Sequence, residues 1–224
     1  MQILGGMLSL IAAYLFGSIP AGFLLVRVFS GRDLRNEHSG RTGGTNVMRV
    51  LGFWAGFATA LFDVLKGAVS VWLAGALTGN QPWMQVAAGL LAILGHNYSI
   101  FLAARVEGKI RLRGGAGGSP TVGAAMGLWA PSALIIIPIG MLILFGLGYA
   151  SVATMSVGFI SAVIFLFRAV FLDQPWAYVA FGILAEGILI LALLPNIRRI
   201  LQGTERVVGL RAKARARPAE DEAG

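Results

Sequence analysis

The stretch LGFWAGFATALFDVLKGAVSVWLAGAL at Leu51–Leu77 decides the fold class. Its only charged residues are Asp63 and Lys66. A helix needs about 20 predominantly apolar residues to cross the hydrocarbon core of a bilayer. Because this stretch exceeds that length, it predicts a membrane-spanning helix.

The composition of the whole chain points the same way. Of its 224 residues, 57% are hydrophobic and 12% are charged, and the mean hydropathy is +0.77. Ordinary soluble domains carry about 25% charged residues, so we expect an integral membrane protein. The absence of cysteine excludes disulfides and thiolate catalysis, and the two histidines, His38 and His96, leave little for a zinc site. We therefore expect no metal site and no cofactor.

Further apolar stretches predict an all-α membrane protein with about seven spans. The predicted spans are Ile3–Val28, Leu51–Leu77, Trp83–Ala104, Gly118–Ala130, Ser132–Leu147, Ser151–Val170 and Pro175–Leu194. We expect a kink at Pro20 in the first span. Pro131 and Pro138 divide the fourth and fifth spans into short pieces, which leaves open a single helix or a re-entrant pair.

Basic residues predict the orientation of these spans. They cluster after the first, third and last spans, whereas the connections Thr78–Pro82 and Asp173–Gln174 contain neither Lys nor Arg. The positive-inside rule then places the N-terminus outside and the C-terminus in the cytoplasm. The net charge of +8 fits topology and attraction to anionic headgroups better than nucleic-acid binding. We expect one transmembrane domain over residues 1–210 and a disordered, charged cytoplasmic tail over residues 211–224.

Three charges inside the apolar spans need an explanation, because each costs about 2.5–3.5 kcal/mol on insertion scales. Asp63 and Lys66 stand three residues apart, which places them on one helical face. They could form an ion pair that steadies the helix, or they could face a substrate. Glu186 has no partner in sequence, and the pattern assigns it no role.

Two glycine-rich segments that carry arginine predict an anion site. They are SGRTGGTNVMR at Ser39–Arg49 and RLRGGAGGSPT at Arg111–Thr121. Glycine allows backbone N–H groups to converge on an anion, and arginine supplies paired donors. Neither segment contains the GxxxxGK[ST] pattern of a nucleotide-binding P-loop. Their position between apolar spans suggests a phosphate at the lipid surface.

His96 ends the third apolar stretch in the sequence GHNYS, and Ser151 begins a later span. A lone histidine can be a structural residue or a base, and the sequence alone leaves both open. No spacing of Ser, His and Asp indicates a catalytic triad.

The order of these motifs resembles that of the bacterial acyl-phosphate:glycerol-3-phosphate acyltransferases of the PlsY type. The matching stretches are GSIPAG at Gly17–Gly22, HSGRTGGTNVMRVLG at His38–Gly52, DVLKG at Asp63–Gly67, the pair Gly95–His96, and NIRRILQGTE at Asn196–Glu205. The matches run in register over nearly the whole chain.

The resemblance implies a seven-span enzyme of the bacterial plasma membrane whose site faces the cytoplasm. It implies transfer of a fatty acyl group from acyl phosphate to the 1-hydroxyl of glycerol 3-phosphate, which gives lysophosphatidic acid and phosphate for phospholipid synthesis. Its partners would be these two substrates and membrane lipids. Two other hypotheses are a membrane protein that binds a lipid phosphate without this reaction, and a small organic-phosphate transporter.

The resemblance also implies site residues. The catalytic group would be Ser39, Arg49, His96 and Asn196. The residues that bind substrate or phosphate would be Arg41, Thr45, Asn46, Asp63, Lys66, Gly114, Gly115, Gly117, Ser151 and Glu205, with the three glycines forming a second phosphate cradle.

This chain departs from the family pattern in both glycine-rich segments. The family's second segment reads GGKGxAT, so Ala116 stands where a phosphate-binding lysine is expected. In the first segment Arg41 replaces an asparagine and Gly44 replaces an alanine. Arg41, Lys109, Arg111 or Arg113 could restore the missing charge, but a rigid arginine fork does not substitute geometrically for an ammonium group.

Overall fold

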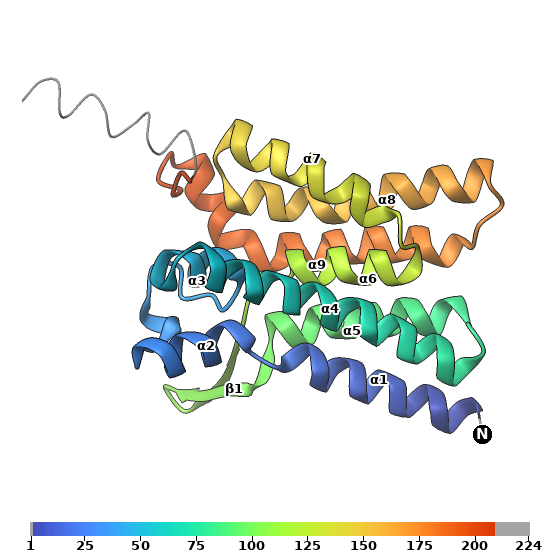
Figure 1. Ribbon diagram of the computed structural model, residues 1–224, viewed down its shortest axis with the longest axis horizontal. Coiled ribbons are helices and arrows are strands. Elements are labelled where there is room, and N and C mark those ends of the chain that lie inside the picture. Colours follow the sequence, from blue (N-terminus) through green and yellow to red (C-terminus); the bar gives the residue numbers. More distant parts are fainter. Residues whose placement is uncertain (1, 209–224) are drawn as a thin grey trace, which may run out of the picture.

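The chain forms a bundle of helices with one short β-hairpin (Figure 1), and a computed structural model describes residues 2–208. In chain order the elements are α1 Gln2–Ser18, α2 Ala21–Ser30, the short 3₁₀ helix η1 Leu34–Asn36, α3 Gly44–Leu51, α4 Phe53–Thr78, α5 Pro82–Asn97, β1 Ser99–Val106, β2 Lys109–Arg113, α6 Gly118–Leu128, α7 Ser132–Leu147, α8 Ala150–Phe171 and α9 Trp176–Leu201. The predicted tail over residues 211–224 lies outside the described residues.

Four helical stretches of the described chain are long and apolar enough to cross a membrane. They are Ile3–Ser30, which joins α1 and α2, and then Phe53–Thr78, Ala150–Phe171 and Trp176–Leu201. Helix α7 is a shorter apolar helix. The prediction of about seven spans therefore depends on the shorter helices α5, α6 and α7.

The predicted span Trp83–Ala104 is wrong after Asn97. Helix α5 ends at Asn97, and the chain enters β1, which pairs antiparallel with β2. The connecting residues Glu107 and Gly108 both have positive φ, 52° and 76°, which suits the tight turns of two-residue hairpins. The strand-forming residues of β1 are apolar, and hydropathy alone does not distinguish them from the end of a helix. This hairpin is therefore the exception to the predicted all-α fold.

The expected kink at Pro20 is confirmed, and it is a full break between α1 and α2. Proline has no N–H group and cannot continue the hydrogen-bond ladder of α1. The carbonyl of Ile19, at the break, accepts a hydrogen bond from Lys66 Nζ at 3.0 Å. This carbonyl also accepts from the backbone N–H of Ala21 at 3.1 Å, so the buried ammonium of α4 is its second partner.

The two prolines of the central stretch have different effects. Helix α6 ends at Leu128 and α7 begins at Ser132, with Pro131 at the N-cap of α7, so the alternative of a single helix is wrong. Pro138 lies inside α7, which continues past it. Helix α6 has 11 residues and is only about 16 Å long at 1.5 Å per residue. It is too short to cross a bilayer core of about 30 Å.

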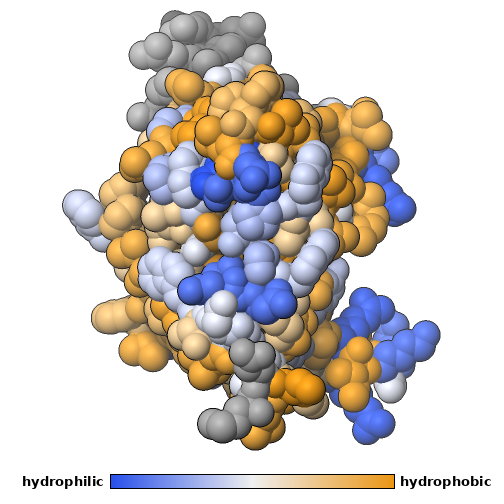
Figure 2. Space-filling model, turned by 90° about the vertical axis from the view of Figure 1, so that its right-hand side faces the viewer, coloured by the Kyte–Doolittle hydropathy of each residue, from blue (hydrophilic) through white to orange (hydrophobic). Residues whose placement is uncertain are grey.

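Glycines allow close contacts between helices, and many large apolar residues face outward. A Cβ atom on Gly67 of α4 would collide with the carbonyl oxygen of Pro120 in α6, so these helices approach closely only because glycine is present. Trp54 and Leu191 are 78% and 64% exposed, as expected for side chains that face lipid. Figure 2 looks onto the end where α4 turns into α5 and α8 into α9, and there hydrophilic residues gather centrally with hydrophobic residues around them.

Candidate functional site

Most of the predicted site residues line one cleft at the end of the bundle where α3 begins. The cleft has a volume of ≈ 270 Å³ and also receives residues of α4, α5, α6, α8 and α9. The predicted residues that line it are Ser39, Arg41, Thr45, Asn46, Arg49, Asp63, His96, Ser151, Asn196 and Glu205. Lys66, Gly114, Gly115 and Gly117 are not among the described residues that line it.

Two helices begin at this cleft without side-chain caps. Gly43 precedes α3 and Gly117 precedes α6, and neither N-cap makes a side-chain hydrogen bond. Gly44 and Gly118, the first residues of these helices, both line the cleft. The first N–H groups of a helix have no partner within the helix and carry its positive dipole end. Both glycine-rich segments therefore present an anion-binding helix terminus to the same space.

The first segment is shaped by Asn46, whose side chain is occupied within the protein. Its Nδ2 donates to the carbonyl oxygens of Arg41 at 2.8 Å and Glu37 at 3.1 Å. Its Oδ1 accepts from the backbone N–H of Ser39 at 3.5 Å. The amide thus folds the loop before α3, while Ser39 and Thr45 remain exposed at the cleft.

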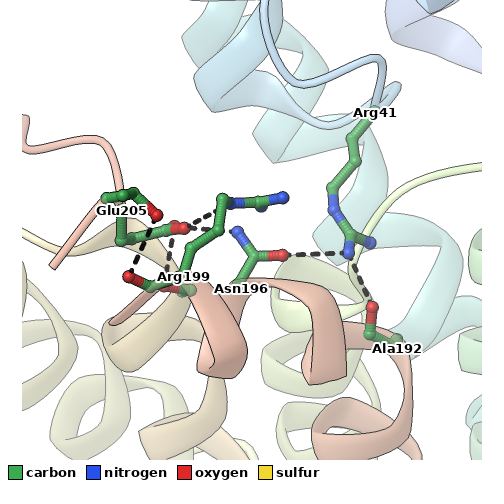
Figure 3. A network of polar contacts seen from close by, with 7 residues as sticks. Arg41, Ala192, Asn196, Arg199 and Glu205 are labelled. Atoms are coloured by element: carbon green, nitrogen blue, oxygen red, sulfur yellow. Dashed lines mark hydrogen bonds and ion pairs between the residues drawn. The ribbon is translucent and has the colours of Figure 1, made fainter. Parts of the chain in front are cut away.

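Arg41 connects the two glycine-rich segments to α9. Its Nη1 donates to the carbonyl oxygen of Gly115 at 3.1 Å, and its Nη2 donates to the carbonyl oxygen of Ala192 at 2.6 Å and to Asn196 Oδ1 at 3.2 Å (Figure 3). Within residues 2–208 it forms no ion pair with a carboxylate. Burial and the nearby Arg199 lower the pKa of Arg41, but arginine remains charged in proteins. Its positive charge is therefore open to a bound anion.

Arg49 of α3 supplies a second positive charge to the cleft. Its side chain is half-buried, and it makes no hydrogen bond or ion pair with another residue of the described chain. Burial and the neighbouring Arg206 lower its pKa, while Glu205 raises it. A half-buried guanidinium with free donors is suited to binding a phosphate in a bidentate manner.

Glu205 joins the end of α9 to the start of α8. Its Oε1 accepts from Asn196 Nδ2 at 2.8 Å and from Ser151 Oγ at 3.1 Å, and its Oε2 accepts from Arg199 Nε at 2.8 Å (Figure 3). Burial alone would raise the pKa of Glu205, but these hydrogen bonds outweigh it and hold the pKa below its ordinary value. Glu205 therefore neutralises Arg199 and fixes Asn196 beside Arg41.

Asp63, Lys66 and His96 form a buried polar cluster below the cleft. The predicted ion pair is confirmed, with Lys66 Nζ 2.9 Å from Asp63 Oδ1. His96 Nδ1 lies 3.4 Å from the same oxygen, while Asp63 Oδ2 is buried without a hydrogen-bond partner in the described chain. Lys66 is 1% exposed and reaches the cleft only through Asp63. Asp63 and His96 themselves line the cleft. In the Asp63–Lys66 pair, Asp63 therefore faces the cleft and Lys66 has a structural role.

The three glycines predicted to form a phosphate cradle pack against the end of α5. The backbone N–H of Gly115 donates to the carbonyl oxygen of His96 at 2.9 Å, and a Cβ on Gly115 would collide with His96 Nε2. Gly114 lies equally close to the end of α5, and Gly117 has a φ of 94°, which favours glycine. The second segment instead presents Ala116, Gly118 and Ser119 to the cleft, and the three-glycine cradle stays a prediction.

Several cleft residues were not predicted as site residues. The polar ones among them are His38, Ser119, Thr154, Arg199 and Arg206. Arg199 lies in the motif NIRRILQGTE, and Arg206 follows it as one of the basic residues after the last span. Arg199 follows Asn196 by three residues, which places both on one helical face, and this spacing was the available signal. Ser119 lies in the second glycine-rich segment, which was the available signal for it, whereas Thr154 carried none beyond its helix.

Comparisons with known proteins agree with this geometry. The family described as glycerol-3-phosphate acyltransferase matches residues 7–203. A glycerol-3-phosphate acyltransferase of Thermus thermophilus is 39% identical over 207 residues, covering 92% of this chain and 97% of the relative. Glycerol-3-phosphate acyltransferase 2 of Moorella thermoacetica is 36% identical over 207 residues, covering 92% and 99%.

Solved structures extend the similarity to the fold. The glycerol 3-phosphate form of PlsY, an integral membrane glycerol 3-phosphate acyltransferase, superposes with a TM-score of 0.80 at 30% identity, covering 93% of this chain and 98% of that one. Its lysophosphatidic acid form gives a TM-score of 0.75 at 30% identity, covering 91% and 95%. The similarity therefore spans nearly the whole chain in sequence and in structure.

Proposed function

Because the chain belongs to the glycerol-3-phosphate acyltransferase family, we propose that it acylates the 1-hydroxyl of glycerol 3-phosphate from acyl phosphate, releasing lysophosphatidic acid and inorganic phosphate. The two related structures are the glycerol 3-phosphate form and the lysophosphatidic acid form of PlsY, which fits the proposed acceptor and product. The acyl phosphate donor is the part of the proposal that rests on the motif resemblance.

The single observation that carries the proposal is the double anion site in the cleft. Two uncapped helix N-termini meet in ≈ 270 Å³ with Arg41 and Arg49, two arginines that form no ion pair with a carboxylate of residues 2–208. Both proposed substrates carry a phosphate group, and such a site attracts phosphate through helix dipoles and charged hydrogen bonds. The polar side chains include many hydrogen-bond donors and few bases. This composition suits acyl phosphate, an acyl donor that is already activated.

The reaction needs no covalent enzyme intermediate, since acyl phosphate is a mixed anhydride. The hydroxyl oxygen forms a bond to the acyl carbonyl carbon, the bond from that carbon to the phosphate oxygen breaks, and its electron pair leaves with phosphate. The departing phosphate can accept the hydroxyl proton. Alignment of the two substrates can contribute about 7–11 kcal/mol in favourable cases, so positioning is the main task of the protein.

We assign the residues to this task by their place in the cleft. Ser39, Thr45 and Arg49 bind phosphate together with the N-terminus of α3. Arg41 supplies positive charge beside Ala116, where the family pattern has lysine, because its guanidinium is bonded to the adjacent Gly115. The predicted catalytic residues His96 and Asn196 border the substrates, with Asp63 behind His96.

The proposed topology has seven spans in a single domain of the bacterial plasma membrane, with the cleft facing the cytoplasm. Helices α5, α6 and α7 complete the count begun by the four long spans, with α6 covering only part of the bilayer core and the cleft at its N-terminus occupying the rest. Because α6 is only about 16 Å long and begins at the cleft, the cleft reaches into the bilayer core. This depth gives the acyl chain of the donor access from lipid, while the basic segments lie in the cytoplasm.

The test is synthesis of lysophosphatidic acid by the purified protein in detergent micelles from palmitoyl phosphate and labelled glycerol 3-phosphate. We expect product, and we expect Arg49→Ala to lower kcat/KM by roughly thirty-fold to several thousand-fold, the range for removing one partner of a buried charged pair. Arg198→Ala is the matched control, because Arg198 is exposed and outside the cleft lining.

Other outcomes of this assay separate the alternatives. Release of inorganic phosphate without lysophosphatidic acid would identify a hydrolase. Absence of both products would support a binding protein. Equal synthesis from acyl-coenzyme A would overturn the acyl phosphate donor while leaving the acceptor intact.

A further inference from the structure

The β1–β2 hairpin is a projecting element that the proposed reaction does not use. The two strands pair through Ala104 with Arg111, Arg105 with Ile110 and Val106 with Lys109. Figure 1 shows the hairpin extending sideways from the bundle at the end that holds α2 and α3. A feature that projects beside membrane-spanning helices lies within reach of the bilayer surface.

Strand β2 is amphipathic. Lys109, Arg111 and Arg113 alternate with Ile110 and Leu112, and successive side chains of a strand point to opposite sides. All five residues are exposed, and Ile110 is 76% exposed. One side of the strand is therefore basic and the other apolar, and Ile110 near the turn is the more exposed of its two apolar residues, since Leu112 is 37% exposed.

One alternative role for charge on an edge strand is to prevent aggregation through pairing with the strand of another molecule. That role explains Lys109 and Arg111, but it leaves the exposed apolar side chains unexplained. Phe101 and Ile100 of β1 are also exposed, by 58% and 49%. Exposed aliphatic and aromatic side chains together with basic ones are typical of segments that lie in the headgroup region of a membrane.

The base of the hairpin is fixed to a membrane-spanning helix. Ser99 Oγ donates to the carbonyl oxygen of Ser18, and Tyr14 of α1 donates its hydroxyl hydrogen to the carbonyl oxygen of Tyr98 at 2.9 Å. Leu102 is 5% exposed and anchors β1 on the bundle. Since α1 belongs to a candidate span, these contacts hold the hairpin at a constant height relative to the bilayer.

The charge balance of the hairpin determines the chemistry of its partner. Residues 99–113 contain Arg105, Lys109, Arg111 and Arg113 against a single acid, Glu107. The cytoplasmic leaflet presents anionic headgroups, and basic segments beside a span are attracted to them within a Debye length. We propose that the β1–β2 hairpin docks on anionic lipid headgroups, with its basic side chains at the phosphates and Ile110 inserted among the headgroups.

The absence of cysteine from the chain provides a clean probe of this docking. An Ile110→Cys variant of the full chain, labelled with an environment-sensitive fluorophore, is placed in nanodiscs of phosphatidylcholine with or without phosphatidylglycerol. We expect blue-shifted emission and weaker acrylamide quenching only with phosphatidylglycerol. The difference is expected to vanish in 1 M salt, where the Debye length falls from about 10 Å at 0.1 M to about 3 Å.

Two substitutions test the role of the basic side chains in the labelled background. Arg105→Gln and Lys109→Gln are each expected to lower the ratio of docked to undocked hairpin about fivefold. Arg32→Gln is the matched control, because it removes one exposed positive charge that follows α2, outside the hairpin, and is expected to leave the ratio unchanged. A label at Asn80→Cys, at the other end of the bundle, should not respond to lipid charge.

The readout requires no turnover, so it is independent of the acyltransferase reaction. A label at residue 110 that is equally quenched in both kinds of nanodisc overturns the proposal. An Arg32→Gln effect as large as that of Lys109→Gln overturns the assignment to the hairpin. If the label at residue 110 is protected from acrylamide only after an acidic soluble protein is added, and not by phosphatidylglycerol, the partner is a protein and the proposed lipid partner is overturned.

Discussion

Arg41 is the residue that joins the parts of the cleft. Its contacts to Gly115, Ala192 and Asn196 connect the first glycine-rich segment to the second and to α9. Two of the three acceptors are backbone carbonyls, so the protein holds the guanidinium in place without neutralising its charge. This arrangement both positions the cleft walls and leaves a positive charge for a phosphate group.

We predict that Arg41→Lys fails to replace Arg41. A lysine cannot reproduce the planar fork that reaches the separate acceptors, and hydrogen bonds to charged groups are each worth about 1.5–3 kcal/mol. We expect kcat/KM for glycerol 3-phosphate to fall about ten- to a hundred-fold, while Arg198→Lys leaves it unchanged. Steady-state kinetics measures this effect. An Arg41→Ala/Ala116→Lys protein that recovers activity would show that charge near the second segment matters more than the bridge.

Glu205 is the second residue on which the cleft depends, because it receives hydrogen bonds from three residues. Its pKa is lower in the folded protein than in the unfolded chain, so the folded state favours the ionised form. Ionised Glu205 therefore stabilises the folded protein fully at pH values above its pKa in the unfolded chain, about 4.3. This stabilisation is lost as the pH falls through that value towards the pKa of Glu205 in the folded protein.

We therefore predict a pH-dependent effect of Glu205→Gln on stability. At pH 7 the variant should lose about 1.5–3 kcal/mol, the usual value for hydrogen bonds to a charged group. The difference from the unchanged protein should shrink below about pH 4 as Glu205 becomes protonated. Thermal unfolding in detergent at several pH values measures it. A difference that is constant from pH 7 to pH 3 would contradict this account of Glu205.

Among the elements, α8 and α9 show how close packing replaces the hydrophobic effect inside the membrane. A Cβ on Gly182 of α9 would collide with the backbone of Ala162 in α8, and a Cβ on Gly158 would lie 2.7 Å from Cα of Glu186. Lipid is as apolar as the helix surfaces, so contact between backbones and hydrogen bonds must hold such helices together. Glu186 Oε2 adds one such bond by accepting from the N–H of Phe159 at 3.1 Å.

We predict opposite effects for two glycines of α9. Gly182→Ala should destabilise the protein, because the added methyl group meets Ala162 across the interface. Gly187→Ala should be neutral or stabilising by up to about 1 kcal/mol, because nothing lies within 4 Å of its Cβ position and alanine is the better helix former. Thermal unfolding of both variants in the same detergent is the measurement. Equal melting temperatures for the two would contradict the proposed packing.

At the scale of the whole molecule, polar groups are concentrated at the ends of an apolar bundle. The cleft lies at one end, and the opposite end carries the short connections α4–α5 and α8–α9. In the proposed topology, a phosphate substrate from the cytoplasm and an acyl chain from the bilayer meet where the polar cleft extends below the membrane surface. The proposal derives that depth from the short helix α6, which begins at the cleft.

Hydropathy predicted the long spans well, because a continuous apolar run of sufficient length has few alternatives in a bilayer. It failed for Trp83–Ala104, because the apolar residues of β1 that follow the polar run GHNYS resemble the end of a helix in hydropathy. The Asp63–Lys66 pair was predictable, because it depends only on local helical spacing. The link from Lys66 to Ile19 was not, because it depends on a break in another helix.

The sequence by itself determined the membrane class, the long spans and the glycine-rich, arginine-bearing segments, since these depend on composition and on neighbours along the chain. Only the tertiary structure decided that the N-termini of α3 and α6 face one cleft, that Arg41 reaches Asn196, and that Gly115 packs on His96. Such contacts join residues distant in sequence, as with the 155 positions between Arg41 and Asn196. They follow from how the helices pack, which local periodicity does not encode.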